Sequence, residues 1–141
     1  MSKVAVMFTL AAVATLSALP AMAESAVPDM RGTWKGNSES VVSGGANPHH
    51  ATQSAETRFS TIAFTLTVDK QDGRRFSGTF VSARSNDQVV AVIGRNGSIY
   101  MADDDGYTVG TVLAPNRIEL CYMHSSPTAK VASCTELTKQ P

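Results

Sequence analysis

The chain has 141 residues, of which 43% are hydrophobic and 17% charged, and its twelve basic residues balance its twelve acidic residues. This balance, with no basic patch or stripe along the sequence, argues against a nucleic-acid partner. The length is that of one domain, and a chain of this size buries about two-thirds of its unfolded surface on folding. That is enough for a core without a cofactor.

The first 23 residues have the pattern of a secretory signal peptide. Lys3 precedes an apolar run over residues 4–19, which is followed by Pro20 and by Ala21-Met22-Ala23. A basic start, a short apolar core and an A-x-A site are typical of cleaved export signals. A membrane-spanning helix needs about 20 apolar residues, more than this run offers. We expect cleavage after Ala23, a single mature domain over residues 24–141, and a periplasmic or secreted protein.

Eight short segments follow, in which apolar and polar residues alternate as they do in β-strands. The clearest is residues 58–69, where Ile62, Phe64, Leu66 and Val68 alternate with smaller or polar residues. The eight predicted strands are residues 30–42, 58–69, 75–83, 88–94, 98–103, 107–114, 117–124 and 130–138.

Compact turn sequences separate the later segments. They are Gln71-Asp72-Gly73, Asn96-Gly97, Asp105-Gly106 and Pro115-Asn116. Asn-Gly between alternating segments is a strong signal for a two-residue hairpin. With one hairpin after another, no long crossover and no helical periodicity after the signal, the sequence predicts an all-β fold. The expected architecture is an eight-stranded antiparallel up-and-down barrel.

The two cysteines, Cys121 and Cys134, are expected to form a disulfide, because an exported protein meets an oxidising compartment. A turn over residues 126–129 makes the numbers of cross-strand partners sum to 255, which places these two cysteines opposite each other. The same register pairs Ile118 with Leu137 on the inner face. The cysteines then lie on the outer face of the last hairpin, as a structural clasp.

Hairpin registers also assign faces in the middle of the chain. Asn96-Gly97 pairs Ile93 with Tyr100, and Asp105-Gly106 pairs Tyr100 with Thr111. The inner face would then hold Val89, Ala91, Ile93, Tyr100, Ala102, Val109 and Leu113. The outer wall would hold Val90, Val92, Ile99, Met101 and Val112.

An apolar outer wall of this kind often marks an interface. We therefore expect either a homo-oligomer or a docked partner at the predicted strands 88–94, 98–103 and 107–114. An alternative is a β-bulge that exchanges the two faces of one strand. In that case Val89, Ile93 and Tyr100 would face outward.

Two short motifs resemble those of a known group. Gly32-Thr33-Trp34 resembles the G-x-W opening of the calycins, which include lipocalins, fatty-acid-binding proteins and avidins. The sequence from Phe76 to Ser82 resembles the third-strand pattern of avidins, aromatic-x-Gly-Thr-aromatic-x-Ser. The resemblance implies an eight-stranded barrel with a ligand cup at one open end. It also implies that Trp34 is structural and plugs the closed end.

The departures from the avidin pattern argue against biotin as the ligand. Avidins line the cup with several tryptophans, whereas this chain has one. Phe80 stands where avidins carry a tyrosine whose hydroxyl holds the ureido oxygen of biotin, although Ser82 matches the neighbouring serine. A lost hydrogen-bond partner for a buried polar group costs about 1–3 kcal/mol.

The expected function is therefore binding of a small, largely apolar ligand by an exported barrel. Aromatic residues would supply contact area and hydroxyls would supply orientation, as is usual in small-molecule sites. The expected ligand-binding residues are Phe64, Leu66, Phe80, Ser82, Tyr100, Tyr122 and Ser133. The same inward positions describe a filled core equally well. No cofactor, metal site or enzymatic activity is expected, because no nucleophile stands in a G-x-S-x-G context.

Other readings of the sequence remain open. An exported inhibitor or interaction module would act through residues 24–30, through the loop over residues 43–57 and through the outer wall. A structural component of the cell envelope is a third option. In a ligand-binding barrel, the loop over residues 43–57 would instead serve as a lid beside the mouth, because long loops in small domains are often functional.

Two clusters of polar residues are weak candidates for metal binding. His49 and His50 lie in a Gly-rich loop and, with His124, lack the spacing typical of metal sites. Residues 103–105 are all aspartate, but they lack the spacing and the distal glutamate of a calcium loop. We interpret the aspartates as turn residues.

Overall fold

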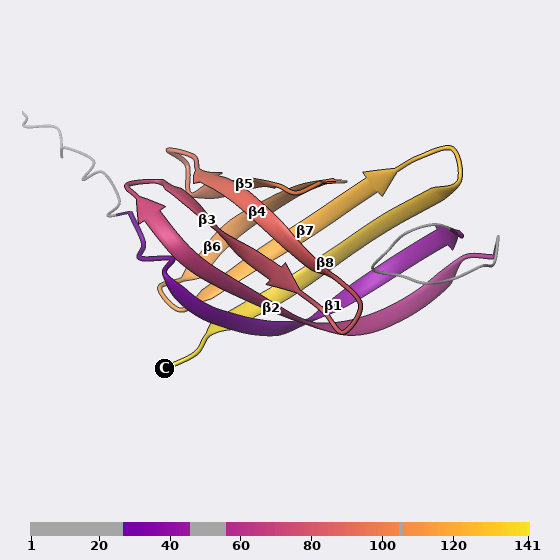
Figure 1. The fold of residues 1–141 in the computed structure, drawn as a ribbon, viewed down its shortest axis with the longest axis horizontal. Helices are drawn as coiled ribbons and strands as arrows, with labels where there is room; N and C mark the ends of the chain where they lie inside the picture. Colours follow the sequence, from indigo (N-terminus) through magenta and orange to yellow (C-terminus); the bar gives the residue numbers. More distant parts are fainter. Residues whose placement is uncertain (1–26, 46–55, 105) are drawn as a thin grey trace, which may run out of the picture.

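The computed structural model describes residues 27–45, 56–104 and 106–141 (Figure 1). All eight predicted strands are present, and they form a closed antiparallel barrel in which neighbours in sequence are neighbours in space. The predicted all-β, up-and-down barrel is therefore confirmed. The strands are β1 (Gly32–Gly44), β2 (Arg58–Asp72), β3 (Arg75–Val81), β4 (Asn86–Ile93), β5 (Ser98–Ala102), β6 (Tyr107–Ala114), β7 (Arg117–Ser125) and β8 (Ala129–Lys139).

The barrel has two unlike ends. The connections over residues 73–74, 94–97 and 115–116 lie at one end, which we call the closed end. The connections over residues 82–85, 103–106 and 126–128 lie at the other, which we call the mouth. At the mouth, the long strands β7, β8, β1 and β2 project beyond the four shorter ones (Figure 1). The pairing of β2 with β3, for example, begins only at Thr65 opposite Val81.

Trp34 plugs the closed end. Its side chain is buried, and its Nε1 donates a 2.8 Å hydrogen bond to the carbonyl oxygen of Met30, which is itself fully buried. Gln71 secures the same segment from β2, because its Oε1 accepts from the Met30 amide at 2.7 Å and its Nε2 donates to the Pro28 carbonyl at 2.8 Å. The Lys139 ammonium lies 5.4 Å from the Trp34 ring centroid, within the range of a cation–π contact.

The residues before β1 are thus part of the barrel's base. The Lys139 Nζ donates to the backbone oxygen of Asp29 at 2.8 Å. The Arg31 side chain donates to the Asp29 carboxylate at 2.9 Å, and this hydrogen bond holds the pKa of Asp29 below its usual value. The expectation of an exposed, active segment over residues 24–30 is wrong for Met30, because its burial against Trp34 removes it from any partner. Residues 24–26 lie outside the described part of the chain.

The apolar core fills the closed-end half of the barrel. Inward residues alternate with exposed ones along every strand, as a half-buried antiparallel sheet requires. Members of the core come from seven strands and from the segment before β1, and they are Met30, Trp34, Leu66, Val68, Phe76, Val89, Ile93, Ile99, Met101, Ile118, Leu120 and Leu137.

The predicted register of the last hairpin is confirmed. Cys121 lies opposite Cys134 and Ile118 opposite Leu137, and the two cysteines form a disulfide with an S–S distance of 2.05 Å. Cys134 is exposed, and so are Glu119 and Glu136 beside the disulfide. The disulfide therefore fastens the outer wall of the barrel.

The predicted register between β4 and β5 is wrong by one residue. Ile93 pairs with Ile99, because Gly94 and Ser98 enclose a loop of three residues, not two: the Gly94 amide donates to the Ser98 carbonyl at 2.7 Å, and Gly97 takes a positive φ of 80°. Such a loop is a type I turn closed by a glycine in the left-handed region. A shift of one residue exchanges the two faces of a strand.

Several predicted placements change as a result. Ile99 and Met101 are buried in the core, not on the outer wall, and Tyr100 is 49% exposed instead of facing inward. Tyr100 pairs with Val109, so Val109 also faces outward. Val89 and Ile93 lie inside as expected, and Val90 and Val92 lie outside as expected.

A β-bulge in β6 accounts for the remaining difference. Ala114 pairs with Arg117 across the Pro115-Asn116 turn, and Val112 lies opposite Ile118. Leu113 is the extra residue and is 43% exposed, whereas Val112 packs against the core. Bulges of this kind are frequent at the rims of barrels.

Candidate ligand-binding site

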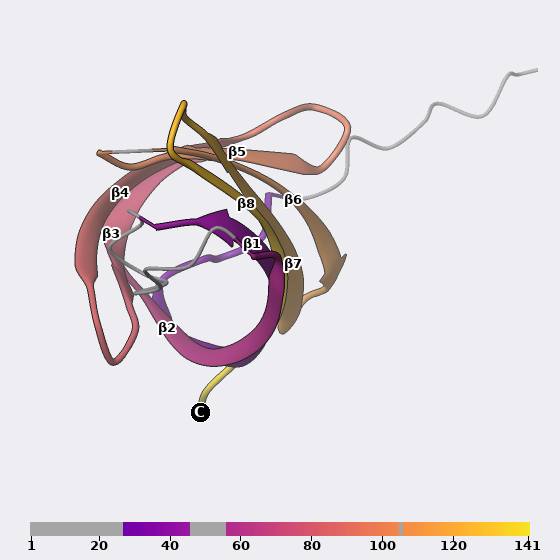
Figure 2. The ribbon, with the colours of Figure 1, turned by 90° about the vertical axis from the view of Figure 1, so that its right-hand side faces the viewer.

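The interior changes from apolar to polar toward the mouth. One row of inward side chains crosses five adjacent strands, from β6 through β7, β8 and β1 to β2, and every member carries a hydroxyl group. We call it the hydroxyl row, and its members are Thr108, Tyr122, Ser133, Ser40 and Ser60. Ser40 and Thr108 are buried, while Tyr122, Ser133 and Ser60 are partly exposed. The hydroxyl row is therefore only partly shielded from solvent. Figure 2 views the barrel from this end.

The inward rows on either side of the hydroxyl row show where the interior changes from apolar to polar. One step deeper, Leu120, Thr135, Ser38 and Ile62 are neighbours across β7, β8, β1 and β2. The buried Ser38 hydroxyl lies 3.2 Å from that of Ser40, so the two form a hydrogen bond.

One step toward the mouth from the hydroxyl row, the inward residues are His124, Val131, Val42 and Arg58. Val42 and Val131 are buried, and Arg58 lies on the same inward face because it pairs directly with Val42. The Nε and Nη2 atoms of Arg58 are shielded from solvent and make no hydrogen bond to any of the described residues. A charged donor without an acceptor is unusual in a folded protein.

The predicted ligand-binding residues separate into groups. Tyr122 and Ser133 belong to the hydroxyl row. Phe64 and Phe80 stack on each other with ring centroids 4.6 Å apart, and Phe80 is only partly buried. Leu66 is fully buried in the core below them.

The other two predicted residues lie away from this interior. The Ser82 hydroxyl accepts from the amides of Arg84 and Ser85 in the turn between β3 and β4, so it shapes the rim of the mouth. Tyr100 faces outward, because the slipped register of β5 turns it away from the interior.

Gly106 makes room for the Tyr122 ring. A Cβ atom at position 106 would lie 2.2 Å from Tyr122 Cε2, which is closer than any real contact. The turn that presents Gly106 is held by its amide, which donates to the Asp103 carboxylate at 2.7 Å. The predicted Asp105-Gly106 two-residue turn is wrong, because Ala102 pairs with Tyr107 and the connection spans residues 103–106.

Sequence reasoning missed Arg58 and most of the hydroxyl row. The signal was available in part: positions 58 and 60 continue the even-numbered, inward series of Ile62, Phe64 and Leu66. Ser38 and Ser40 continue the series of Trp34 in the same way. Polar residues at inward positions near a barrel mouth are the pattern that indicates a binding site.

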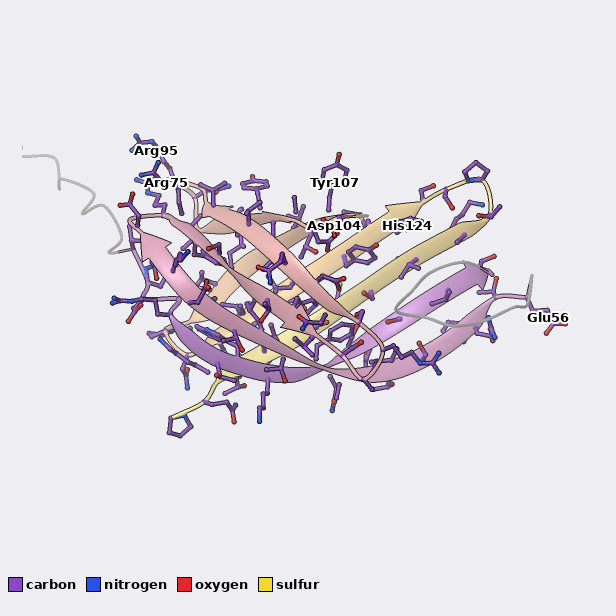
Figure 3. All side chains as sticks on the ribbon, in the orientation of Figure 1. Glu56, Arg75, Arg95, Asp104, Tyr107 and His124 are labelled. Carbon is purple, nitrogen blue, oxygen red and sulfur yellow. A yellow bond between two sulfur atoms is a disulfide. The ribbon has the colours of Figure 1, made fainter. Side chains whose placement is uncertain are left out.

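Among the described residues, no group of three or more His, Cys, Asp or Glu side chains could hold a metal ion. His49 and His50, and most of the loop proposed as a lid, lie outside the described residues. His124 lies toward the mouth, with Asp104 and Tyr107, far from Arg75 and Arg95 at the closed end (Figure 3).

No protein-family model matches the chain, and no curated protein matches its sequence. Among solved structures, the S-type phycobiliprotein lyase CPES from Guillardia theta is similar with a TM-score of 0.37 and 10% identity, over 79% of this chain and 89% of that chain.

No helix within residues 27–45, 56–104 and 106–141 is long and apolar enough to cross a membrane.

Proposed function

We propose that this chain is an exported binding protein that holds a small molecule in the mouth half of its barrel. One observation carries the proposal: the inward residues change from a packed apolar core at the closed end to a row of five hydroxyl groups at the mouth. Polar side chains at inward positions suit a site that holds a polar ligand group better than they suit a packed core, because burying a hydroxyl costs free energy unless it is hydrogen-bonded.

Export is supported by the predicted signal peptide over residues 1–23 and by the disulfide. Disulfides such as Cys121–Cys134 form and persist in oxidising compartments. The proposed location is therefore the periplasm or the extracellular medium.

The polar residues at the mouth narrow the class of ligand that is expected from the sequence. A ligand in this half would meet the hydroxyls of Ser40, Ser60 and Ser133 on one wall. Deeper in the barrel it would meet Ile62 and the stacked pair of Phe64 and Phe80. We propose a small molecule with an apolar body and a polar head, the polar head lying nearest the mouth.

Native mass spectrometry tests this proposal. The protein should be purified gently from the exported fraction of its own source and compared with the same sample after denaturation and refolding. We expect a small-molecule adduct that is present before denaturation and absent afterwards. A protein that carries no adduct, and that also fails to bind compounds from an extract of the same cells after refolding, would contradict the proposal.

A second candidate function is supported by the outer wall of β4–β7. Its exposed apolar side chains are Val90, Val92, Tyr100, Tyr107, Val109, Leu113 and Met123. Val92, Tyr100 and Val109 are direct cross-strand neighbours, so they form one continuous patch. This composition differs from the predicted one, but the wall is again apolar, and it supports self-association.

Sedimentation of the Tyr100→Glu variant tests the second candidate. We expect the unaltered mature protein to sediment as an oligomer and the variant as a monomer, because a charge in the centre of the patch must be desolvated on association. Thr67→Glu, on the outer face of β2, is the matched control and should leave the oligomer intact. A monomeric unaltered protein would rule out self-association through this wall.

A further inference from the structure

Arg58 is a partly buried cation, and one hydrogen-bonding edge of its guanidinium group is shielded from solvent and unused by the described residues. It lies at the start of β2, on the inward face, beside the buried Val42 and next to Ser60 of the hydroxyl row. Its Nε and Nη2 atoms are both shielded from solvent, and neither has a hydrogen-bond partner among the described residues.

These two atoms form one edge of the guanidinium group. Their N–H bonds point in nearly the same direction, so together they can donate to both oxygens of a carboxylate or to two oxygens of a phosphate. Because arginine stays protonated at any physiological pH, burial of this edge removes hydration from a full charge. A side chain held in this way is poorly satisfied until an anionic acceptor meets it.

Small side chains flank Arg58 on the neighbouring strands. The inward neighbours of Arg58 on β1 and β8 are small: Val42, Val131 and, one step deeper, Ser40 and Ser133. Successive inward residues along a strand are about 7 Å apart, so the hydroxyl row lies within the length of a small organic molecule from Arg58. Hydroxyl groups can donate to the same anion or to polar atoms next to it.

We propose that Arg58 is the anchor of the ligand site and that the ligand is a small organic oxyanion, a carboxylate or a phosphate ester. The anionic group accepts two hydrogen bonds from the Nε–Nη2 edge, and the rest of the molecule extends past the hydroxyl row into the barrel. This inference rests on the proposed function, since it names the chemical class of the ligand of the same site.

The test uses three probes that share one ring: benzoate, phenyl phosphate and the neutral benzamide. Each is titrated into the ¹⁵N-labelled full mature protein, and the Arg58 Nε–H signal, identified by its loss in Arg58→Gln, is followed by NMR. We expect at least one anion to bind tenfold or more tightly than benzamide and to shift this signal. Whichever anion binds more tightly identifies the head group as carboxylate or phosphate.

Two variants separate ligand recognition from structure. Arg58→Gln should lose the preference for the anion, with at least tenfold weaker binding, and should not lower the unfolding midpoint of the ligand-free protein. Arg95→Gln, at the closed end (Figure 3), removes the same charge and should retain the preference. Arg58→Lys keeps the charge but loses the paired donors, so it should restore binding only in part.

Three results would overturn the assignment of Arg58. They are equal binding of benzamide and the anions, an anion preference that survives in Arg58→Gln, and a clear loss of stability in ligand-free Arg58→Gln. If native mass spectrometry finds a ligand but that ligand is neutral, the anion anchor fails while the binding function stands. If there is no adduct, no compound from the cell extract binds after refolding and no probe binds, both fail.

Discussion

Replacing Trp34 with alanine is expected to lower the free energy of unfolding by about 3–5 kcal/mol, the usual cost of truncating a large buried aromatic residue. Trp34 is 1% exposed, so the substitution leaves a cavity at the closed end. It also removes the indole donor to the Met30 carbonyl and the surface beneath the Lys139 ammonium. Urea unfolding followed by circular dichroism measures the change. A loss below about 1 kcal/mol would show that the closed end does not depend on this plug.

Trp34→Phe is the matched control for this prediction. Phenylalanine keeps much of the ring but lacks the N–H group, so the Met30 carbonyl loses its donor. We expect an intermediate loss of about 1–3 kcal/mol, the range for leaving one buried polar group unsatisfied. If both variants lose the same free energy, the hydrogen bond and not the packing of the ring determines the contribution of Trp34.

Replacing both cysteines with serine is expected to lower the free energy of unfolding by about 3 kcal/mol. The disulfide joins residues separated by 13 positions, and closing a loop of this size restricts the unfolded chain by roughly that amount. Because Cys134 is exposed and the pair lies on the outer wall, the double variant leaves the core packing unchanged. The barrel should therefore still form. Urea unfolding, with the circular dichroism spectrum of the native state as the check on fold, measures both effects.

Reduction of the unaltered protein is the control for the disulfide prediction. The unaltered protein in a thiol reductant should unfold at the same urea concentration as the double serine variant. An unfolding midpoint that does not differ between oxidised and reduced protein would show that the cysteines contribute no stability through their link.

The fold could be predicted where two independent signals agreed. In the last hairpin, the turn over residues 126–129 and the pairing of Cys121 with Cys134 require the same register, and that register is confirmed. Between β4 and β5, Asn96-Gly97 was the only signal. Asn-Gly suits a two-residue turn, but it also ends a three-residue loop with glycine in the left-handed region, and sequence alone did not distinguish the two.

The bulge in β6 shows a second limit. Thr111, Val112 and Leu113 are all compatible with a strand, and none of them marks the extra residue. The bulge is selected by which side chain packs better, since Val112 contacts the core and Leu113 does not. That choice depends on neighbouring strands, so it belongs to the assembled barrel and not to the local sequence.

The candidate site could be predicted only in part. Alternation places Ser60 and Arg58 on the inward face of β2, but the hydroxyl row needs the registers of five strands at once. The burial of the Arg58 donors likewise depends on how the barrel closes around them. The arrangement of the closed end could not be predicted for the same reason. Gln71 accepts a hydrogen bond from the Met30 amide across 41 residues of chain, and no local pattern indicates this contact.

The central claim is that the mouth half of the barrel binds a ligand while the closed end remains packed. The most direct measurement is a map of ¹H–¹⁵N chemical-shift changes in the mature protein on addition of the co-purified ligand or, if it is not identified, of benzoate. We predict changes at Ser40, Ser60 and Ser133, and none at the indole N–H of Trp34, which is hydrogen-bonded at the opposite end. Changes confined to the closed end or to the outer wall of β4–β7 would contradict the account.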